Sequence, residues 1–239
     1  MELISVIIPA REERWLNDTI LGVLDRFKSK PEIIVTLDGK DEKRLDGVRY
    51  IYNKEPRGMR AAINQAVEIA TGKYLMKLDA HCMVGKHIDE RLIKEHHSNW
   101  VQIPRRKRLD AKSWTLIEGK LDIDYMYMNK DFIGIINRGK NADEELKKKL
   151  IDDTETFQGS CYFITKEYFN KLGLLDDKNF AGSGHEAQEI TLKVRCDGGR
   201  IIRNKKTWYA HARMWRFYST DRTKSRNYIK ILANENKVS

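Results

Sequence analysis

The chain has 239 residues, of which 41% are hydrophobic and 33% charged, and its formal net charge is +10 at pH 7. This length allows one large domain with a sizeable core, and no run approaches the roughly 20 apolar residues of a membrane-spanning helix. The excess of positive charge indicates an anionic partner such as nucleotide phosphates, nucleic acid or an anionic membrane surface.

Cysteine usage and the N-terminus indicate a reducing compartment. Cys82, Cys161 and Cys196 lie far apart and form no Cys-x-x-Cys pair, which argues against a disulfide framework and a structural zinc site. The first residues lack the basic region and the small-residue cleavage site of a signal peptide. We therefore expect a cytoplasmic protein.

The first eighty residues alternate between apolar runs and amphipathic stretches. Strands are predicted at four short apolar runs: residues 3–8, 32–37, 48–52 and 74–78. Helices are predicted at two amphipathic stretches: from about residue 17 or 18 to 27, and residues 61–71. This order predicts the α/β class, with a Rossmann-like, mostly parallel sheet flanked by helices. No Gly-x-Gly-x-x-Gly follows the first strand, which disfavours a dinucleotide-dependent dehydrogenase.

The fourth run leads directly into Asp79-Ala80-His81. If the strand continues to this point, residues two apart share a face, and a carboxylate lies beside an imidazole at the carboxyl end of the sheet, where α/β proteins bind ligands. One oxygen and one nitrogen ligand suit a divalent ion such as Mn²⁺, which keeps positions free for phosphates. The alternative interpretation is that Asp79 only caps the following turn.

The middle of the chain is less regular. Residues 86–98 predict a helix whose histidines, at positions 87, 96 and 97, are solvated. The basic cluster at residues 104–108 suggests a loop, and residues 141–149 suggest a charged helix or a mobile loop. A strand is expected within residues 156–164, and a helix at 166–172.

A glycine-containing loop at residues 180–185 enters a helix predicted to begin at Glu186. Glu186 and Glu189 share one helix face, beside a loop that can approach a substrate closely. The helix dipole alone also favours acids in this first turn. Further on, His211 follows the strand-like residues 200–203, and it becomes a third metal ligand only if the fold brings it to Asp79.

Residues 1–82 contain four motifs in a fixed order: Ser5-Val-Ile-Ile-Pro9-Ala-Arg-Glu-Glu13, Asp38-Gly39, Gly58-x-x-x-Ala62-x-Asn64 and Gly72-Lys-Tyr-Leu-x-x-Leu-Asp79-Ala-His81. Together they resemble the nucleotide-sugar half of GT-A glycosyltransferases of family 2. Most family members have Asp-x-Asp in place of Asp-x-His. The latter is similar to the polypeptide N-acetylgalactosaminyltransferases, as is Gly184-His-Glu186-Ala-Gln-Glu189-Ile190 followed by Cys196-Asp-Gly198-Gly199.

This resemblance implies a single GT-A domain, with a nucleotide-sugar-binding half in residues 1–100 and an acceptor half in residues 101–239. It implies that Mn²⁺ or Mg²⁺ is bound by Asp79, His81 and His211 on the diphosphate of a UDP-sugar. The donor-binding residues are then expected to be these: Pro9, Ala10, Arg11, Glu12, Asp38, Arg60, Asn64 and Asp79. From their charge, Arg57, Arg60 and Arg213 are candidates to neutralise the leaving diphosphate.

One departure from the family concerns the catalytic base. Inverting family 2 enzymes have Glu-Asp in the last loop, with the Asp as general base, whereas this chain has Glu186-Ala187. Either Glu186, Glu189 or His185 takes over that role, or the reaction retains configuration without such a base. The sequence leaves both alternatives open.

Residues 203–230 carry nine Lys and Arg against one acid, and aromatic residues are interleaved with them. Basic and aromatic side chains together can hold phosphates and stack bases. This predicts sugar transfer to hydroxymethylated pyrimidines in DNA, as in phage-type modification inside a bacterium or an infected host. A glycan or lipid-linked acceptor is the alternative. A non-catalytic nucleic-acid-binding domain would explain the charge but not the positions of Asp79, His81, Glu186 and His211. A nucleotidyltransferase is disfavoured, because no Gly-rich, Lys-containing phosphate loop directly follows the first predicted strand.

Overall fold

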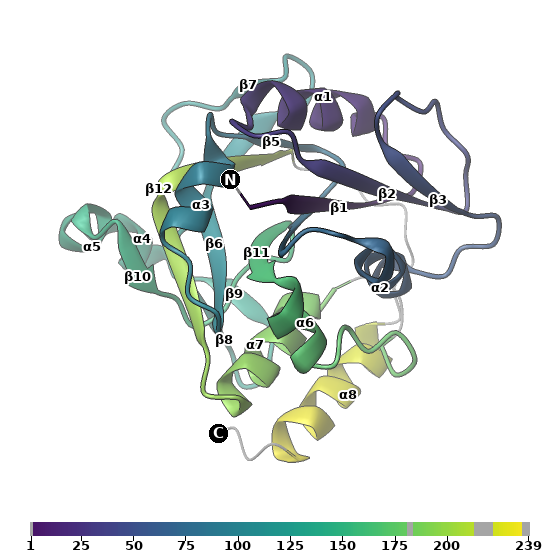
Figure 1. Cartoon of the computed structure of the whole chain (residues 1–239). Coiled ribbons are helices and arrows are strands. Elements are labelled where there is room, and N and C mark those ends of the chain that lie inside the picture. Colours follow the sequence, from purple (N-terminus) through teal and green to yellow (C-terminus); the bar gives the residue numbers. More distant parts are fainter. Residues whose placement is uncertain (1, 181–183, 213–221, 236–239) are drawn as a thin grey trace.

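The structure is a computed structural model that describes residues 2–180, 184–212 and 222–235. A large mixed sheet lies at its centre (Figure 1), with the strand order β10-β12-β6-β11-β4-β1-β2-β3. The strands of this path are β1 (Ile4–Ala10), β2 (Glu32–Asp38), β3 (Arg49–Asn53), β4 (Tyr74–Leu78), β6 (Trp100–Asp110), β10 (Ile151–Asp153), β11 (Cys161–Thr165) and β12 (Arg200–Ala212). Two short strands extend it: β5 (Cys82–Val84) pairs with β12, and β7 (Thr115–Leu116) pairs with β6. A separate pair is formed by β8 (Met126–Met128) and β9 (Gly134–Ile136).

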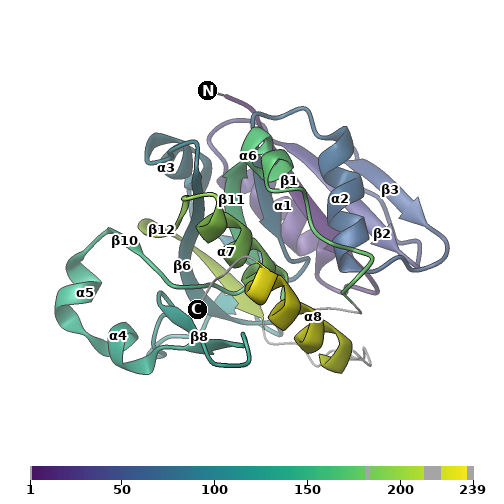
Figure 2. The same ribbon diagram turned by 90° about the horizontal axis from the view of Figure 1, so that it is seen from below.

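Helices cover both faces of the sheet. They are α1 (Leu16–Arg26), α2 (Met59–Ile69), α3 (Ile88–Lys94), α4 (Arg138–Ala142), α5 (Glu144–Lys148), α6 (Lys166–Lys171), α7 (Glu186–Cys196) and α8 (Arg222–Glu235). The apolar side chains of α1 and α3 pack on one face, and those of α2, α6 and α7 pack on the other. Figure 2 shows α8 lying along α7, and α4 and α5 at the opposite end of the molecule from β3. No helix within the described residues is long and apolar enough to cross a bilayer.

The N-terminal half has the predicted parallel architecture. β3, β2, β1 and β4 are neighbours in that order, and all three pairings are parallel. Residues of β1 alternate between the two faces as the two-residue period requires: Val6 and Ile8 belong to one core, and Ile7 to the other. The α/β prediction is therefore confirmed.

The C-terminal half departs from simple alternation. β11 inserts between β4 and β6 and is antiparallel to both, whereas β12 runs parallel to β6. The register of β12 against β6 shifts from Asn204 opposite Pro104 to Trp208 opposite Arg105, so residues 205–207 have no partner on β6. Beyond this irregularity β12 continues to Ala212, and His211 lies opposite Cys82 of β5.

Three sequence predictions need correction. The basic residues 104–108 lie in β6, not in a loop, because acidic side chains neutralise part of the cluster: Arg105 pairs with Asp124, and Lys107 with Asp122. The helix expected over residues 86–98 is the shorter α3. His96 is not solvated, because it packs edge-on against two aromatic rings, and burial lowers its pKa to about 4.

Candidate metal centre and active site

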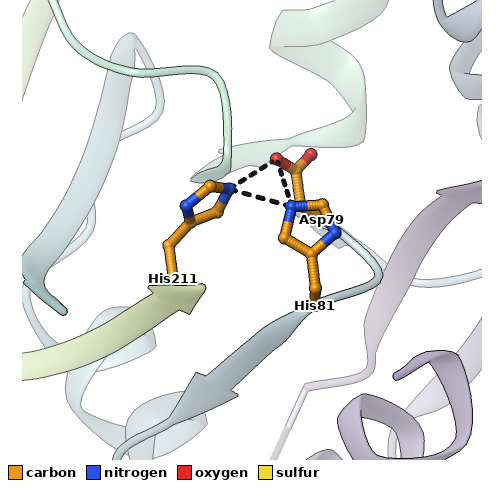
Figure 3. A group of neighbouring side chains, drawn as sticks. All are labelled: Asp79, His81 and His211. Atoms are coloured by element: carbon orange, nitrogen blue, oxygen red, sulfur yellow. Dashed lines mark hydrogen bonds and ion pairs between the residues drawn. The ribbon is translucent and has the colours of Figure 1, made fainter. Parts of the chain in front are cut away.

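Three side chains from distant parts of the chain meet at one end of the central sheet (Figure 3). Asp79 follows β4, His81 lies in the turn before β5, and His211 is near the end of β12. The antiparallel pairing of β5 with β12 sets Cys82 opposite His211, and the backbone N–H of Ala212 donates to the carbonyl of His81 at 3.1 Å. These pairings bring together the three residues named as metal ligands from the sequence.

The distances between their ligand atoms fit a divalent ion. His211 Nε2 lies 3.1 Å from His81 Nε2 and 3.2 Å from Asp79 Oδ2, whereas His81 Nε2 and Asp79 Oδ2 are 4.0 Å apart. Neighbouring ligands of an octahedral ion with ligand distances of about 2.1 Å lie about 3.0 Å from each other. One carboxylate oxygen with two imidazole nitrogens suits Mn²⁺. The donor set therefore fits the ion that the resemblance implies.

The surroundings favour the protonation states that bind a metal. Burial alone would raise the pKa of Asp79, but the adjacent Lys77 ammonium and the two imidazoles outweigh it and hold the pKa well below its usual range. Burial lowers the pKa of His211 to about 4, although Asp79 acts in the opposite direction. At neutral pH the site thus presents a carboxylate and a neutral His211 ring, which are the forms that coordinate metals.

Three residues that contact the ligands were missed in the sequence. Lys77 pairs with Asp79 and also donates to the carbonyl of Gly159 at 2.6 Å. Glu13 Oε2 lies 3.0 Å from His81 Nδ1, and Arg106 Nη2 lies 3.3 Å from His211 Nδ1. The i, i+2 spacing of Lys77 and Asp79 indicates that the two side chains are neighbours. The contact of Arg106 with His211 could not be expected while residues 104–108 were assigned to a loop.

Glu186 is the first residue of α7, and its side chain lies against the backbone of Gly159. A Cβ placed on Gly159 would lie 2.3 Å from Glu186 Oε1, so this approach requires glycine. Glu186 is 8% exposed, and its Oε2 has no hydrogen-bond partner among the described residues. The carbonyl of Gly159 also accepts from Lys77, which pairs with Asp79, so two residues, Gly159 and Lys77, link Glu186 to the metal centre.

Glu189 and Arg60 instead face each other in the interior. Glu189 is fully buried; its Oε2 accepts from Arg60 Nε at 3.2 Å, and its Oε1 accepts from Lys193 Nζ and the Asp176 backbone N–H, each at 2.8 Å. The Arg60 guanidinium lies over the Phe180 ring at 4.0 Å. These contacts connect α2, α7 and the chain around residues 176–180. His185 occupies the N-cap position of α7 with φ 61°.

The residues expected at the nucleoside lie at the carboxyl ends of the parallel strands. Pro9 and Ala10 end β1, residues 11 and 12 follow it directly, and Asp38 ends β2. Asp38 accepts from the backbone N–H groups of Arg57 and Gly58 at 2.8 and 2.9 Å, which fixes the entry to α2. Asn64 exchanges two hydrogen bonds with the backbone of Leu175.

Parts of the sequence predictions lie outside the described residues: Arg213, residues 181–183 of the glycine-containing loop, and residues 213–221 of the basic aromatic segment.

Substitution of Gly159 by Ala is expected to displace Glu186 from its position. Overpacking of this kind costs about 1–3 kcal/mol, and we expect turnover to fall more than stability does, because the carboxylate itself must move. Urea unfolding and steady-state kinetics measure the two effects. Gly22→Ala is the matched control, since a Cβ there meets nothing within 4 Å, and a helical Gly-to-Ala change stabilises by about 0.5–1 kcal/mol. Unchanged turnover in Gly159→Ala would contradict a role for Glu186 in this position.

The chain is similar to known proteins in both sequence and structure. Residues 5–173 match the model of glycosyl transferase family 2. The chain is 25% identical over 231 residues to polypeptide N-acetylgalactosaminyltransferase 10 of Homo sapiens, covering 82% of this chain and 35% of that protein. It is also 25% identical over 231 residues to N-acetylgalactosaminyltransferase 7 of Drosophila melanogaster, covering 82% of this chain and 37% of that one.

A crystal structure of GalNAc-T7 with UDP, GalNAc and Mn²⁺ superposes with a TM-score of 0.80 at 19% identity, covering 99% of this chain and 50% of that chain. This confirms the predicted GT-A fold. The chain spans little more than a third of the length of the curated relatives it matches. The match to the family model covers well over half of the sequence and includes Asp79 and His81, so the chain belongs to glycosyl transferase family 2.

Proposed function

We propose that the chain transfers a sugar from a UDP-sugar to an acceptor hydroxyl, with Mn²⁺ or Mg²⁺ bound by Asp79, His81 and His211. The observation that carries this proposal is the convergence of one carboxylate and two imidazoles at the carboxyl edge of the sheet. Such an ion acts as a Lewis acid that neutralises the charge growing on the leaving diphosphate. The GalNAc-T7 structure with UDP and Mn²⁺ supports the choice of donor and ion.

The protein side chains prepare the site for this reaction. Lys77 keeps Asp79 ionised and directs one carboxylate oxygen away from the imidazoles. Glu13 orients the ring of His81 through Nδ1. We place Pro9, Ala10, Arg11, Glu12 and Asp38 at the nucleoside because of their positions at the strand ends.

Among the three predicted catalytic residues, we assign the reacting carboxylate to Glu186. Its Oε2 is buried without a partner among the described residues, whereas both oxygens of Glu189 have partners. Such a carboxylate can stabilise positive charge at the anomeric carbon or accept the proton of the acceptor hydroxyl. His185, its neighbour, is the alternative base. Donor contacts by Arg60 and Asn64 remain predictions, since their described contacts are to Glu189, Phe180 and Leu175.

The acceptor is a separate question. In the basic aromatic segment, Arg203 is 1% exposed and donates to backbone carbonyls, and Lys205 donates to the hydroxyl of Tyr125. Tyr209 is buried and bonds to Ser160. These residues support the fold and do not form a surface for phosphates. Hydroxymethylated DNA, a glycan or lipid-linked hydroxyl, and the polypeptide named by the relatives are therefore the acceptors to compare, and a cytoplasmic location stays a prediction.

The test is incubation of the purified chain with Mn²⁺ and a panel of UDP-hexoses and UDP-N-acetylhexosamines, followed by measurement of UDP release. We expect one donor to be hydrolysed slowly and EDTA to stop the reaction. Each acceptor class is then added, and its product is identified by mass spectrometry. Binding of DNA without binding of any nucleotide sugar would favour the non-catalytic alternative, and absence of nucleotide-sugar binding with every divalent ion would overturn the proposal.

A further inference from the structure

The two histidines of the metal centre have partners of opposite hydrogen-bonding character. His81 Nδ1 faces the carboxylate of Glu13, which accepts hydrogen bonds, whereas His211 Nδ1 faces the guanidinium of Arg106, which only donates. In a neutral imidazole one nitrogen donates and the other accepts. For neutral rings, these partners assign the proton of His81 to Nδ1 and the proton of His211 to Nε2.

The remaining contacts agree with this assignment. His211 Nε2–H has two acceptors within reach, Asp79 Oδ2 at 3.2 Å and the unprotonated Nε2 of His81 at 3.1 Å. Each hydrogen bond of the two imidazole rings with Glu13, Arg106, Asp79 and each other thus joins a donor to an acceptor; the longer contact of His81 Nε2 with Asp79 Oδ2, at 4.0 Å, is not a hydrogen bond. The proton on His211 Nε2 lies among the three ligand atoms, which is the position that a cation needs.

A cation bound by all three residues requires the lone pair of His211 Nε2. The ring stays neutral if one proton leaves Nε2 and one is taken up at Nδ1, but an Nδ1–H would then face the Nη2–H of Arg106 at 3.3 Å. Metal-binding histidines ordinarily donate their other N–H to a carboxylate, carbonyl or water. His81 has such an acceptor in Glu13, and His211 has a donor instead.

The charge of Arg106 acts in the same direction. Arg106 is 9% exposed, and an arginine side chain keeps its charge in proteins. A full positive charge therefore lies next to His211, which is one of the three proposed ligands of the cation. Its Nε has no hydrogen-bond partner among the described residues, so Nη2 on His211 is the described polar contact of this guanidinium. Nothing described ties Arg106 to a carboxylate that would keep it there when an anion arrives.

We propose that Arg106 is a positioning residue that holds His211 in the tautomer without a free Nε2 lone pair, and thereby weakens cation binding until a diphosphate draws Arg106 away. The cation would then bind weakly alone and more tightly together with the nucleotide. The part that concerns the nucleotide rests on the proposed function. The part that concerns His211 and the cation does not.

The test is titration of the full chain with Mn²⁺ by calorimetry, without nucleotide, for the native protein, Arg106→Met and Arg106→Gln. Changes of a group beside a metal ligand alter metal affinity about 10- to 100-fold. We expect tighter binding by that factor in both variants, and more in Arg106→Gln, whose amide oxygen can accept from His211 Nδ1–H. Lys107→Met removes the same charge from the next residue of β6 without contact to His211, and it is expected to leave the affinity unchanged.

Two further readouts separate tautomer control from a general effect on folding. Long-range ¹H–¹⁵N NMR is expected to show the His211 proton on Nε2 in the native metal-free protein and on Nδ1 in Arg106→Gln. UDP is expected to tighten Mn²⁺ binding in the native protein more than in Arg106→Met. Thermal unfolding checks that both variants are folded, and either one suffices for the comparison.

Unchanged or weaker Mn²⁺ binding in the folded variant, or no Mn²⁺ binding in any of the proteins, would overturn the inference. If Arg106→Gln binds Mn²⁺ more tightly but no protein binds a nucleotide sugar, the role of Arg106 toward the cation stands and the proposed function fails.

Discussion

Replacement of Asp79 by Asn is expected to abolish measurable Mn²⁺ binding and to lower turnover about 1,000-fold or more, because about 4 kcal/mol of metal-dependent stabilisation of the transition state is lost. Asp79 supplies the anionic ligand of the predicted set, and a neutral amide is a much poorer ligand for a hard cation. Calorimetric Mn²⁺ titration and UDP release from the preferred donor measure the two effects. Retained Mn²⁺-dependent turnover in Asp79→Asn would contradict the assignment.

The controls for this variant follow from its surroundings. Lys77 remains buried after the substitution and loses the negative charge that pairs with its ammonium, although the amide oxygen of the new side chain and the Gly159 carbonyl can still accept from it, so some loss of stability is expected. His211→Ala therefore serves as a second variant that keeps the Lys77–Asp79 pair, with His97→Ala, an exposed histidine, as its match. Asp41→Asn, at an exposed aspartate that pairs with Arg44, is the matched control for Asp79→Asn.

The Glu189→Ala variant is expected to lose about 3–5 kcal/mol of unfolding free energy, the usual cost of leaving one partner of a buried ion pair alone. Glu189 is fully buried, and its removal leaves the Arg60 guanidinium in the interior without its carboxylate. It also removes the acceptor for the Asp176 backbone N–H. Urea unfolding followed by circular dichroism gives the free energy.

The same experiment distinguishes the two roles considered for Glu189. Glu144→Ala removes a carboxylate from an exposed i, i+3 pair with Lys147, where about 0.5 kcal/mol or less is expected. A structural role predicts a large loss of stability and a turnover that follows the folded fraction. If Glu189→Ala is as stable as Glu144→Ala but inactive, Glu189 is catalytic and our assignment to Glu186 is wrong.

The metal ligands could be proposed from sequence because local patterns and a family resemblance indicate them, but the structure brings Asp79 and His81 together in a different way from the one expected. We expected Asp79 and His81 to share a strand face. β4 ends at Leu78, and the two side chains converge through the turn that leads to β5. His211 had no local signal, and its place depended on the resemblance.

The residues around the ligands could not be predicted, because their contacts span long stretches of chain. Glu13 and His81 are 68 positions apart, and Arg106 and His211 are 105 apart. The first contact joins the segments that follow the parallel neighbours β1 and β4. The second depends on the pairing of β12 with β6, in the half of the sheet where the antiparallel β11 breaks the strand–helix alternation. A run of charges also predicts a loop when the acids that neutralise it, such as Asp122 and Asp124, lie in another segment.

The irregular pairing of β12 with β6 has a consequence for how the site tolerates changes of chain length. Residues 205–207 of β12 have no partner on β6. Alternate residues of a strand point to opposite faces of the sheet, so the number of these unpaired residues determines the face on which the His211 side chain lies. Its neighbours are Ala210 and Ala212, whose side chains offer no atom that can coordinate a cation. Deletion or insertion of one residue near position 206 would therefore place an alanine where His211 now lies, although none of the three ligand residues would itself be mutated.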